Sequence, residues 1–223
     1  MIQNFWKYIL IIFLFSSNLK STEYEITILA TNIANFGGIR EWSFSALLAS
    51  EEESILFDTG FDENTVLHNA NLLKKDLSKV EKVILSHFHG DHTGGLIKLR
   101  KTYMNSNPKS FSDVYVAEGF FDQRFDEHGA LRGFIGGFNK VSDFKEKAEN
   151  LGINFIVIDE TYELAPNLVL SGPVERIFER VVVSPGFYLK ENGALVDDIL
   201  KDDQSLGIKT EKGWYMMSGC GHA

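Results

Sequence analysis

The sequence predicts one domain of mixed α and β structure, and three features support this. Short runs of apolar, β-prone residues gather in the early and late parts of the chain. Segments with apolar residues at helical spacing lie between these runs. Of the 223 residues, 44% are hydrophobic, which is enough to bury one core of ordinary size. This pattern fits two sheets with helices outside them.

The earliest elements are three strands and a helix. Strands are expected at residues 24–31, 44–49 and 54–58. Polar residues 50–53 join the last two of these strands as a hairpin. A helix is expected at residues 63–73, because apolar side chains recur there at helical spacing and Asp62 can serve as its N-cap.

The later elements alternate in type. A short buried strand is expected at residues 80–86, which are rich in apolar, β-prone side chains. A helix is expected to begin near Leu96, after two glycines that allow it to lie tight against the sheet. The remaining elements are a strand at 114–118, a helix at 143–151, and strands at 154–159, 162–170 and 214–218.

The most informative segment has the pattern H-x-H-x-D-H at residues 87–92, directly after the strand at 80–86. It holds three of the six histidines of the chain and one aspartate. Neutral imidazole and carboxylate oxygen are the ligands that Zn²⁺ and similar ions use at catalytic sites. The alternative is a polar loop that holds histidines by accident. A chance occurrence of this pattern is expected in roughly a few chains in ten thousand.

The spacing within this segment predicts where the ligands point. His87 and His89 are two residues apart on extended chain, so their side chains lie on the same side and can bind one ion. Gly90 permits the backbone to bend. Asp91 and His92 follow that bend, so this pair is placed to hold a second ion close to the first.

Several segments resemble the metallo-β-lactamase superfamily. Residues 86–96 resemble its histidine signature, I-L-F-D-T-G at 55–60 its strand-end Asp motif, and S-G-C-G-H-A at 218–223 the loop with the third His of the first metal site. Together with residues 41–48 and 202–206, they resemble one branch of that superfamily. This branch is the superfamily II metal-dependent hydrolases related to the archaeal dihydropterin–ribofuranosylaminobenzene phosphate synthase. The resemblance extends over residues 24–223.

The resemblance implies an α+β fold, namely an αββα sandwich, around a centre for two divalent metal ions. The expected ions are two Zn²⁺, with Fe or Mn as alternatives. One group of histidines is assigned to the first ion and an Asp–His pair to the second. The first group is His87, His89 and His222, and the second is Asp91 and His92.

The chemistry expected of such a centre is hydrolysis. A metal-activated water, with its pKa lowered toward about 7, would attack a carbonyl or phosphoryl substrate. Asp58 is expected to orient the histidine loop through hydrogen bonds. Where only the first metal site fills, Asp91 is free to act as a general base. Two alternatives stay open, which are a non-catalytic metal-binding fragment of such an enzyme and a pterin-linked transferase.

The resemblance also predicts that the domain at residues 23–223 is truncated at its C-terminus. Superfamily members usually carry a bridging Asp and a final His after the third His, whereas this chain stops one residue after His222. Asp202 and Asp203 are expected to be surface residues, and Cys220 a small buried structural residue. A contact of Arg124 or Arg132 with an anionic substrate is a minor alternative.

Residues 1–22 predict a secretory signal peptide, with Lys7, a short apolar core at 8–15 and small polar residues after it. An uncleaved N-terminal anchor is the alternative, and it would be the only contact with a membrane. Either way, the domain is expected to be secreted or periplasmic. The net charge of −9 argues against nucleic acid as a partner, so the expected partner is a small-molecule substrate.

Overall fold

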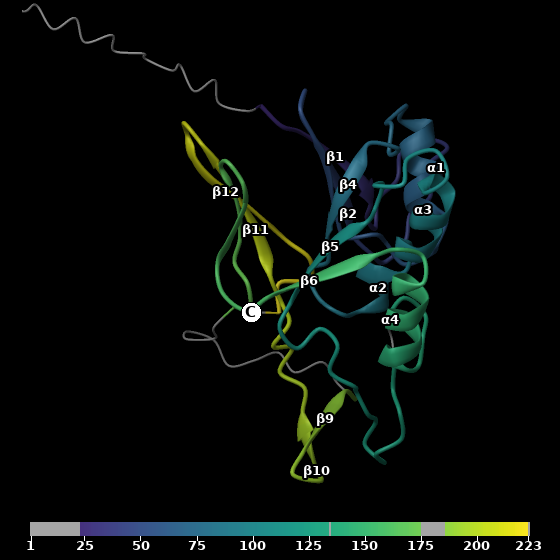
Figure 1. Ribbon diagram of the computed structural model, residues 1–223, viewed down its shortest axis with the longest axis vertical. Helices are drawn as coiled ribbons and strands as arrows, with labels where there is room; N and C mark the ends of the chain where they lie inside the picture. The colour runs from purple at the N-terminus through teal and green to yellow at the C-terminus, as the bar shows by residue number, and fades with distance from the viewer. Residues whose placement is uncertain (1–22, 134, 175–185, 223) are drawn as a thin grey trace, which may run out of the picture.

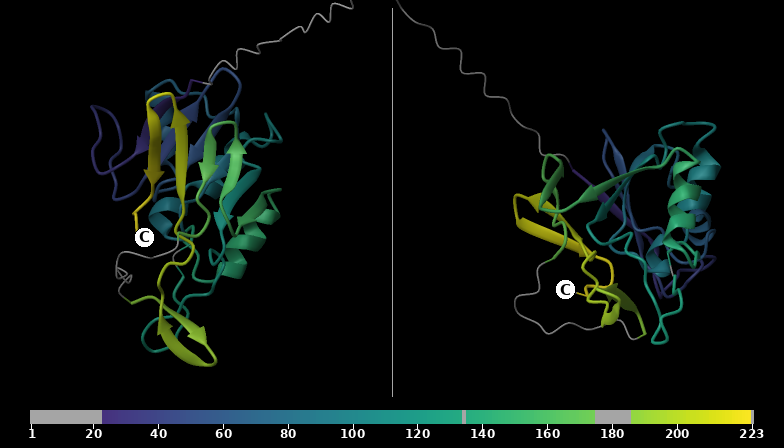
Figure 2. Two further views of the ribbon diagram at one scale, coloured as in Figure 1. Left: turned by 90° about the vertical axis from the view of Figure 1, so that its left-hand side faces the viewer. Right: turned by 60° about the horizontal axis from the view of Figure 1, so that its bottom comes forward.

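The computed structural model describes residues 23–133, 135–174 and 186–222, so the expected signal peptide lies outside the described residues. Two β-sheets pack face to face, and helices α1, α3 and α4 lie along the outer side of the first sheet (Figure 1). Strands β11 and β12 lie on the opposite side, and two further views show the same layers (Figure 2). Three of the four layers of the expected αββα sandwich are therefore present. Over the described ranges, no helix covers the outer face of the second sheet. The truncation stays a prediction.

The first sheet has six strands in the order β1-β2-β3-β4-β5-β6. The first three strands pair antiparallel, and the pairs from β3 to β6 are parallel. These strands match the expected ones to within two residues at each end. Their bounds are β1 Glu25–Ala30, β2 Ser45–Ala49, β3 Ser54–Phe57, β4 Val80–Ile84, β5 Asp113–Ala117 and β6 Asn154–Ile158.

Helices connect the parallel strands of this sheet. Their bounds are α1 Thr65–Leu72, α2 Gly90–Thr93, α3 Leu96–Tyr103 and α4 Val141–Glu149. The expected N-cap of α1 is wrong by two residues, because Asn64 occupies that position and makes no side-chain cap. Asp62 instead accepts a hydrogen bond from the Asn64 backbone N–H at 2.9 Å, in the turn before the helix.

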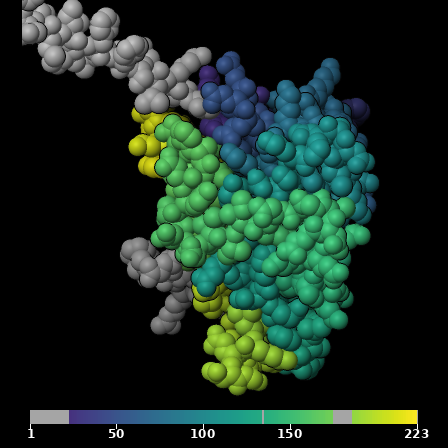
Figure 3. Space-filling view, viewed as in Figure 1, coloured from purple at the N-terminus to yellow at the C-terminus, as the bar shows by residue number. Residues whose placement is uncertain are grey.

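The second sheet has four strands in the order β12-β11-β8-β7. One strand was expected at 162–170, but the chain reverses at Asn167, whose φ of 68° lies in the left-handed region. The result is a hairpin of two strands, and β9 with β10 forms a separate hairpin that projects from one end of the molecule (Figure 3). The bounds are β7 Tyr162–Ala165, β8 Leu168–Leu170, β9 Tyr188–Glu191, β10 Ala194–Asp197, β11 Ser205–Thr210 and β12 Gly213–Ser218.

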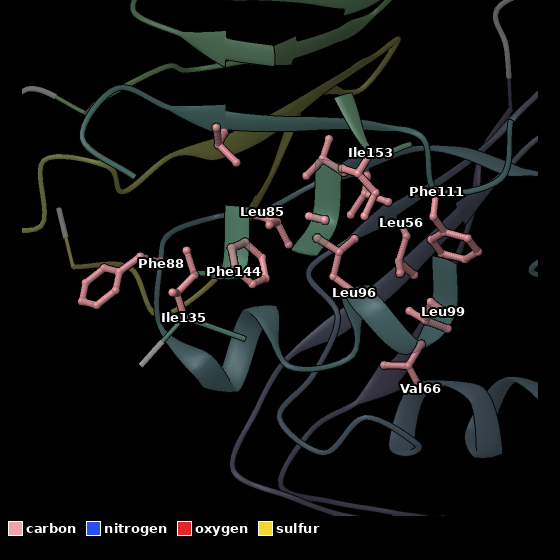
Figure 4. Packing of buried hydrophobic residues seen from close by; sticks show 14 of the residues in the cluster. Leu56, Val66, Leu85, Phe88, Leu96, Leu99, Phe111, Ile135, Phe144 and Ile153 are labelled. Atoms are coloured by element: carbon pink, nitrogen blue, oxygen red, sulfur yellow. The ribbon is translucent and has the colours of Figure 1, made fainter. Parts of the chain in front are cut away.

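Alternation along the strands separates two cores. In β3, Leu56 faces the helices, whereas Ile55 and Phe57 face the second sheet. The helix-side core includes Leu99 and Phe144 and is seen at close range in Figure 4. The core between the sheets joins residues of β2, β3 and β4 to residues of β8 and β11. Burial on both faces therefore holds β3 and β4 in place, and the candidate site lies just beyond these two strands.

The two glycines before α3 lie against the loop after β3, as expected. A Cβ on Gly94 would overlap the carbonyl oxygen of Phe61, and a Cβ on Gly95 would overlap that of Thr59. Only hydrogen fits at these positions, so α3 packs close to the end of β3.

Gly95→Ala is expected to destabilise the protein by about 1–3 kcal/mol, because the new methyl group forces two backbone segments apart. Urea denaturation would measure the change in the free energy of unfolding. Lys101→Ala is the matched control, since Lys101 is exposed on the same helix and its loss should stay within about 0.5 kcal/mol. Equal stabilities of the two variants would contradict the close packing.

None of the helices within residues 23–133, 135–174 and 186–222 has the length and apolar character that a membrane span needs.

Candidate metal centre

The candidate site forms where the ends of three strands meet. Because β3 and β4 are parallel neighbours, Asp58 after β3 lies beside Ser86 after β4. The loop after β12 reaches the same place, since β12 pairs with β11 and the Gln204 backbone N–H donates to the carbonyl oxygen of Ser86 at 2.9 Å. Segments that are more than 100 residues apart in the sequence thus face one another.

Three of the expected ligands form one cluster of imidazole rings. The ring centroids of His87 and His89 are 4.5 Å apart, and those of His87 and His222 are 4.9 Å apart. The centroids of His89 and His222 are 5.2 Å apart. One ring nitrogen from each of these residues, together with the Cys220 sulfur, lies within 4.8 Å of all the others. The structure therefore brings the expected first group together.

The second expected pair lies directly beside this cluster, on the short helix α2. The ring of His92 is centred 4.4 Å from that of His87, and its Nε2 lies 3.5 Å from Asp91 Oδ2. Its Nε2 is also 3.1 Å from the sulfur of Cys220. Asp91, His92 and Cys220 form a second group whose ligand atoms all lie within 4.8 Å of one another.

Asp58 makes the contacts that an orienting carboxylate would make. Its φ of 56° is left-handed, and its buried side chain points at the histidine loop. Oδ1 accepts from the Ser86 backbone N–H at 2.7 Å, and Oδ2 accepts from Ser86 Oγ at 2.8 Å and lies 2.6 Å from His92 Nδ1. Ser86 Oγ is in turn 2.9 Å from His87 Nδ1. The Asp58 carboxylate thus contacts His92 directly and His87 through Ser86, which are two of the five proposed ligands.

Asp58→Asn is expected to weaken metal binding by about 10–100-fold, as loss of a carboxylate behind ligating histidines generally does. The asparagine amide has one acceptor oxygen and one donor NH₂ group. The NH₂ group would therefore face a hydrogen-bond donor of Ser86 or His92. Competition with a chelator would measure the affinity. Asp62→Asn, in an exposed turn, is the control, and equal affinities of the two variants would remove Asp58 from the site.

Burial and neighbouring charges set the protonation of the cluster. Burial, together with the nearby imidazoles, holds the pKa of His87 well below its usual range and lowers that of His89 to about 4. Both rings are therefore neutral at pH 7, as metal ligands must be. Burial would also lower the pKa of His92, but the charge and hydrogen bond of Asp58 outweigh it and raise this pKa to about 12, so an ion that binds His92 has to displace a proton from its ring. Burial would raise the pKa of Asp91, but His92 holds it below its usual range.

A cavity of about 990 Å³ opens over both groups. Its floor includes His89, Asp91, His92 and His222. Its walls carry four aromatic side chains, which are Trp42, Phe44, Phe61 and Phe187. Such a combination of apolar walls and a few convergent polar groups is typical of a small-molecule site.

Arg124 does not face this cavity. Its side chain is buried, with Nε 2.9 Å from Asp198 Oδ2 and Nη2 2.9 Å from Asp202 Oδ1. Its guanidinium lies 3.7 Å from the centre of the Phe88 ring. For Arg124, the alternative of a contact with an anionic substrate is therefore wrong, because every direction of the guanidinium faces protein.

The expected surface position of Asp202 and Asp203 is also wrong, because both are buried. The segment before β11 passes under the histidine loop, and Asp202 Oδ2 accepts a hydrogen bond from the Phe88 backbone N–H at 2.7 Å. Burial raises the pKa of Asp202 to about 6 against the opposing effect of Arg124. This carboxylate therefore holds the backbone between two proposed ligands, His87 and His89.

The expected burial of Cys220 is wrong as well, since this thiol is exposed. One feature of the sequence indicated that Cys220 lies near the ligands, namely its C-x-H spacing to His222. The aromatic walls, Trp42 and Phe187 among them, were missed because no local pattern marks them. His128 lies outside the site and is exposed, with its Nε2 3.8 Å from Glu127 Oε1.

Comparisons with known proteins agree with this geometry. The model of the metallo-beta-lactamase superfamily matches residues 43–222. The chain is 32% identical over 174 residues to the 7,8-dihydropterin-6-methyl-4-(beta-D-ribofuranosyl)-aminobenzene-5'-phosphate synthase of Methanocaldococcus jannaschii, which covers 77% of this chain and 56% of that protein. A second protein of that organism is 27% identical over 199 residues, covering 89% of this chain and 70% of its own length.

The fold has a solved counterpart. The crystal structure of a metal-dependent hydrolase of the beta-lactamase superfamily is similar, with a TM-score of 0.66 and 26% sequence identity. The similarity covers 90% of this chain and 67% of that one. This chain thus spans little more than half the length of the synthase.

Proposed function

This chain belongs to the metallo-beta-lactamase superfamily, and from that premise we propose that it hydrolyses a carbonyl or phosphoryl substrate with the help of two metal ions. One observation carries the proposal. The side chains of His87, His89 and His222 converge next to Asp91 and His92, and all of these except the buried His87 line a cavity with aromatic walls.

The donor chemistry fits divalent ions such as zinc. Three neutral imidazoles that leave one position open are a known ligand set of catalytic zinc, so His87, His89 and His222 would hold the first ion. Asp91 and His92 would hold the second. When bound, the ions supply Lewis acidity, which activates water near neutral pH and stabilises the negative charge that develops on the substrate. Zn²⁺ suits this set, and Fe and Mn remain alternatives.

The residues of the chain have distinct tasks in this proposal. Asp58 holds His92 directly and His87 through Ser86, so both rings keep one orientation. Asp91 is ionised at pH 7 and borders the cavity, so it can accept a proton from water when the second metal site is empty. The aromatic walls would contact an apolar or planar part of a small-molecule substrate.

The proposal is tested with the full chain, its His89→Ala variant and His128→Ala as the matched control. Elemental analysis should find about two ions per chain in the wild type and the control, and fewer in His89→Ala. A panel of esters and phosphodiesters should then show turnover that follows the metal content. Two ions without turnover of any panel member would contradict the hydrolase and favour a non-catalytic metal-binding protein. One weakly held ion would have the same consequence, whereas no bound ion would contradict both the hydrolase and the metal-binding protein.

A second candidate function rests on the 32% identity to the archaeal synthase, whose name includes a dihydropterin. In this case the cavity would bind a reduced pterin. Because Trp42 is a cavity wall with 78% of its surface exposed, titration with a dihydropterin should quench its fluorescence. A Trp42→Phe variant would identify the responding residue. Absence of quenching would remove this candidate and leave the hydrolase.

A further inference from the structure

We propose that Cys220 is the third protein ligand of the second metal ion, together with Asp91 and His92. The inference rests on the proposed function in one respect, which is that both need a metal centre. It adds a ligand to that centre and states which kind of ion the second site prefers.

The distances fit a shared ion. The sulfur of Cys220 lies 3.1 Å from His92 Nε2, which in turn lies 3.5 Å from Asp91 Oδ2. A tetrahedral zinc with bonds of about 2.3 Å to sulfur and about 2.0 Å to nitrogen holds its ligand atoms about 3.5 Å apart. Both separations from His92 are therefore near the one that a shared ion would impose, and all three ligand atoms lie within 4.8 Å of one another.

The number of ligands gives an independent reason. The first ion has three imidazoles and an open position, as catalytic sites generally have. Within the described residues, Asp91, His92 and Cys220 form a group whose ligand atoms lie within 4.8 Å of one another, so with the thiol this group also has three members. The Cys220 sulfur also lies within 4.8 Å of the nitrogens of the first group, so the alternative to be tested is a bond to the first ion.

The backbone holds the thiol at this place. Gly219 lies so close to the Asp58 network that a Cβ would overlap Ser86 Oγ and come within 3.1 Å of Asp58 Oδ2. On the other side, Ser218 ends β12 and pairs with Ser205 of β11. The loop is thus fixed at both the strand and the glycine, and Cys220 follows directly at the rim of the cavity.

A thiolate ligand changes the expected metal. Thiolate is a soft ligand that favours zinc, whereas carboxylate and water favour manganese or magnesium. We therefore expect the second site to prefer zinc over manganese. Cys220→Ser, which replaces the soft ligand with a hard oxygen, should reduce this preference.

Cobalt is a suitable probe, because thiolate bound to Co²⁺ gives a charge-transfer band in the near ultraviolet. The chain contains one cysteine, so such a band can come only from Cys220. The full-length metal-free protein is titrated with Co²⁺ while absorbance and bound metal are recorded. The band should appear with the second equivalent of Co²⁺ and not with the first.

The variants define the role further. Cys220→Ser should lose the band, keep one tightly bound ion and bind the second at least about tenfold more weakly. Cys220→Ala checks that serine oxygen does not replace the thiolate, and His128→Ala should behave as the wild type. Circular dichroism reports whether each variant is folded, and the wild-type titration is decisive even if both Cys220 variants unfold.

The outcomes separate this inference from the proposed function. Two bound ions without the band would overturn the assignment of Cys220 and leave the hydrolase intact. A band that grows with the first equivalent would place Cys220 on the first ion and would also overturn it. No bound metal in the wild type would contradict both proposals.

Discussion

Replacing His87 with alanine is expected to remove the first metal ion and to lower the rate of hydrolysis by at least about a thousandfold. His87 is the most buried of the proposed ligands, with Nδ1 2.9 Å from Ser86 Oγ and Nε2 2.9 Å from His89 Nδ1. Without it the first ion keeps only two imidazoles. The metal content and the rate constant kcat of the variant would be measured with the substrate found in the panel.

The control for this prediction is His68→Ala. His68 is exposed on α1, where its Nε2 lies 2.8 Å from the Gly37 carbonyl oxygen, and it belongs to neither group of proposed ligands. It should keep both metal and activity. A folded His87→Ala variant that retains its metal and its rate would show that the imidazole cluster is not the catalytic centre.

Arg124→Met is expected to destabilise the protein by about 3–5 kcal/mol, which is the usual cost of leaving buried charges without a partner. Asp198 and Asp202 would remain buried, and Arg124 Nη1 would no longer donate to the carbonyl oxygens of Gly119, Phe120 and Asp122. For a chain of this length, the melting temperature should fall by about 10 °C. Urea denaturation and thermal melts would measure both quantities.

Two further variants separate the causes. Arg124→Lys keeps the charge but loses the planar fork, so its stability should lie between those of the wild type and Arg124→Met. Arg132→Met is the control, because Arg132 is an exposed arginine that donates to the Gly186 carbonyl oxygen at 2.7 Å. A loss below about 1 kcal/mol in Arg124→Met would contradict a buried ion-pair network.

Local patterns in the sequence predicted most of the first sheet and four of the five proposed ligands. His87, His89, Asp91 and His92 lie within six residues, so a strand end and one bend were enough to bring them together. His222 is different, because its approach depends on the pairing of β12 with β11, and only the family resemblance indicated it. Strand β11 itself was not anticipated.

The buried ion pairs could not be predicted in this way. Arg124 and Asp202 are 78 residues apart, and no periodicity in either segment indicates the other. Charged residues are seldom fully buried unless they are paired, so each of them alone suggests a surface position. Cys220 was misjudged for the opposite reason, since free cysteines are usually buried, and only the structure shows that this one is exposed and lies beside His92.

The exposure of Cys220 has a practical consequence. As the only thiol of the chain, it allows a fluorophore or spin label to be attached at the cavity rim and nowhere else, without engineering of the sequence. A bound ion would shield the sulfur from such reagents. The rate of alkylation would then report how full the centre is, so the occupancy of the site becomes a quantity that can be followed in time.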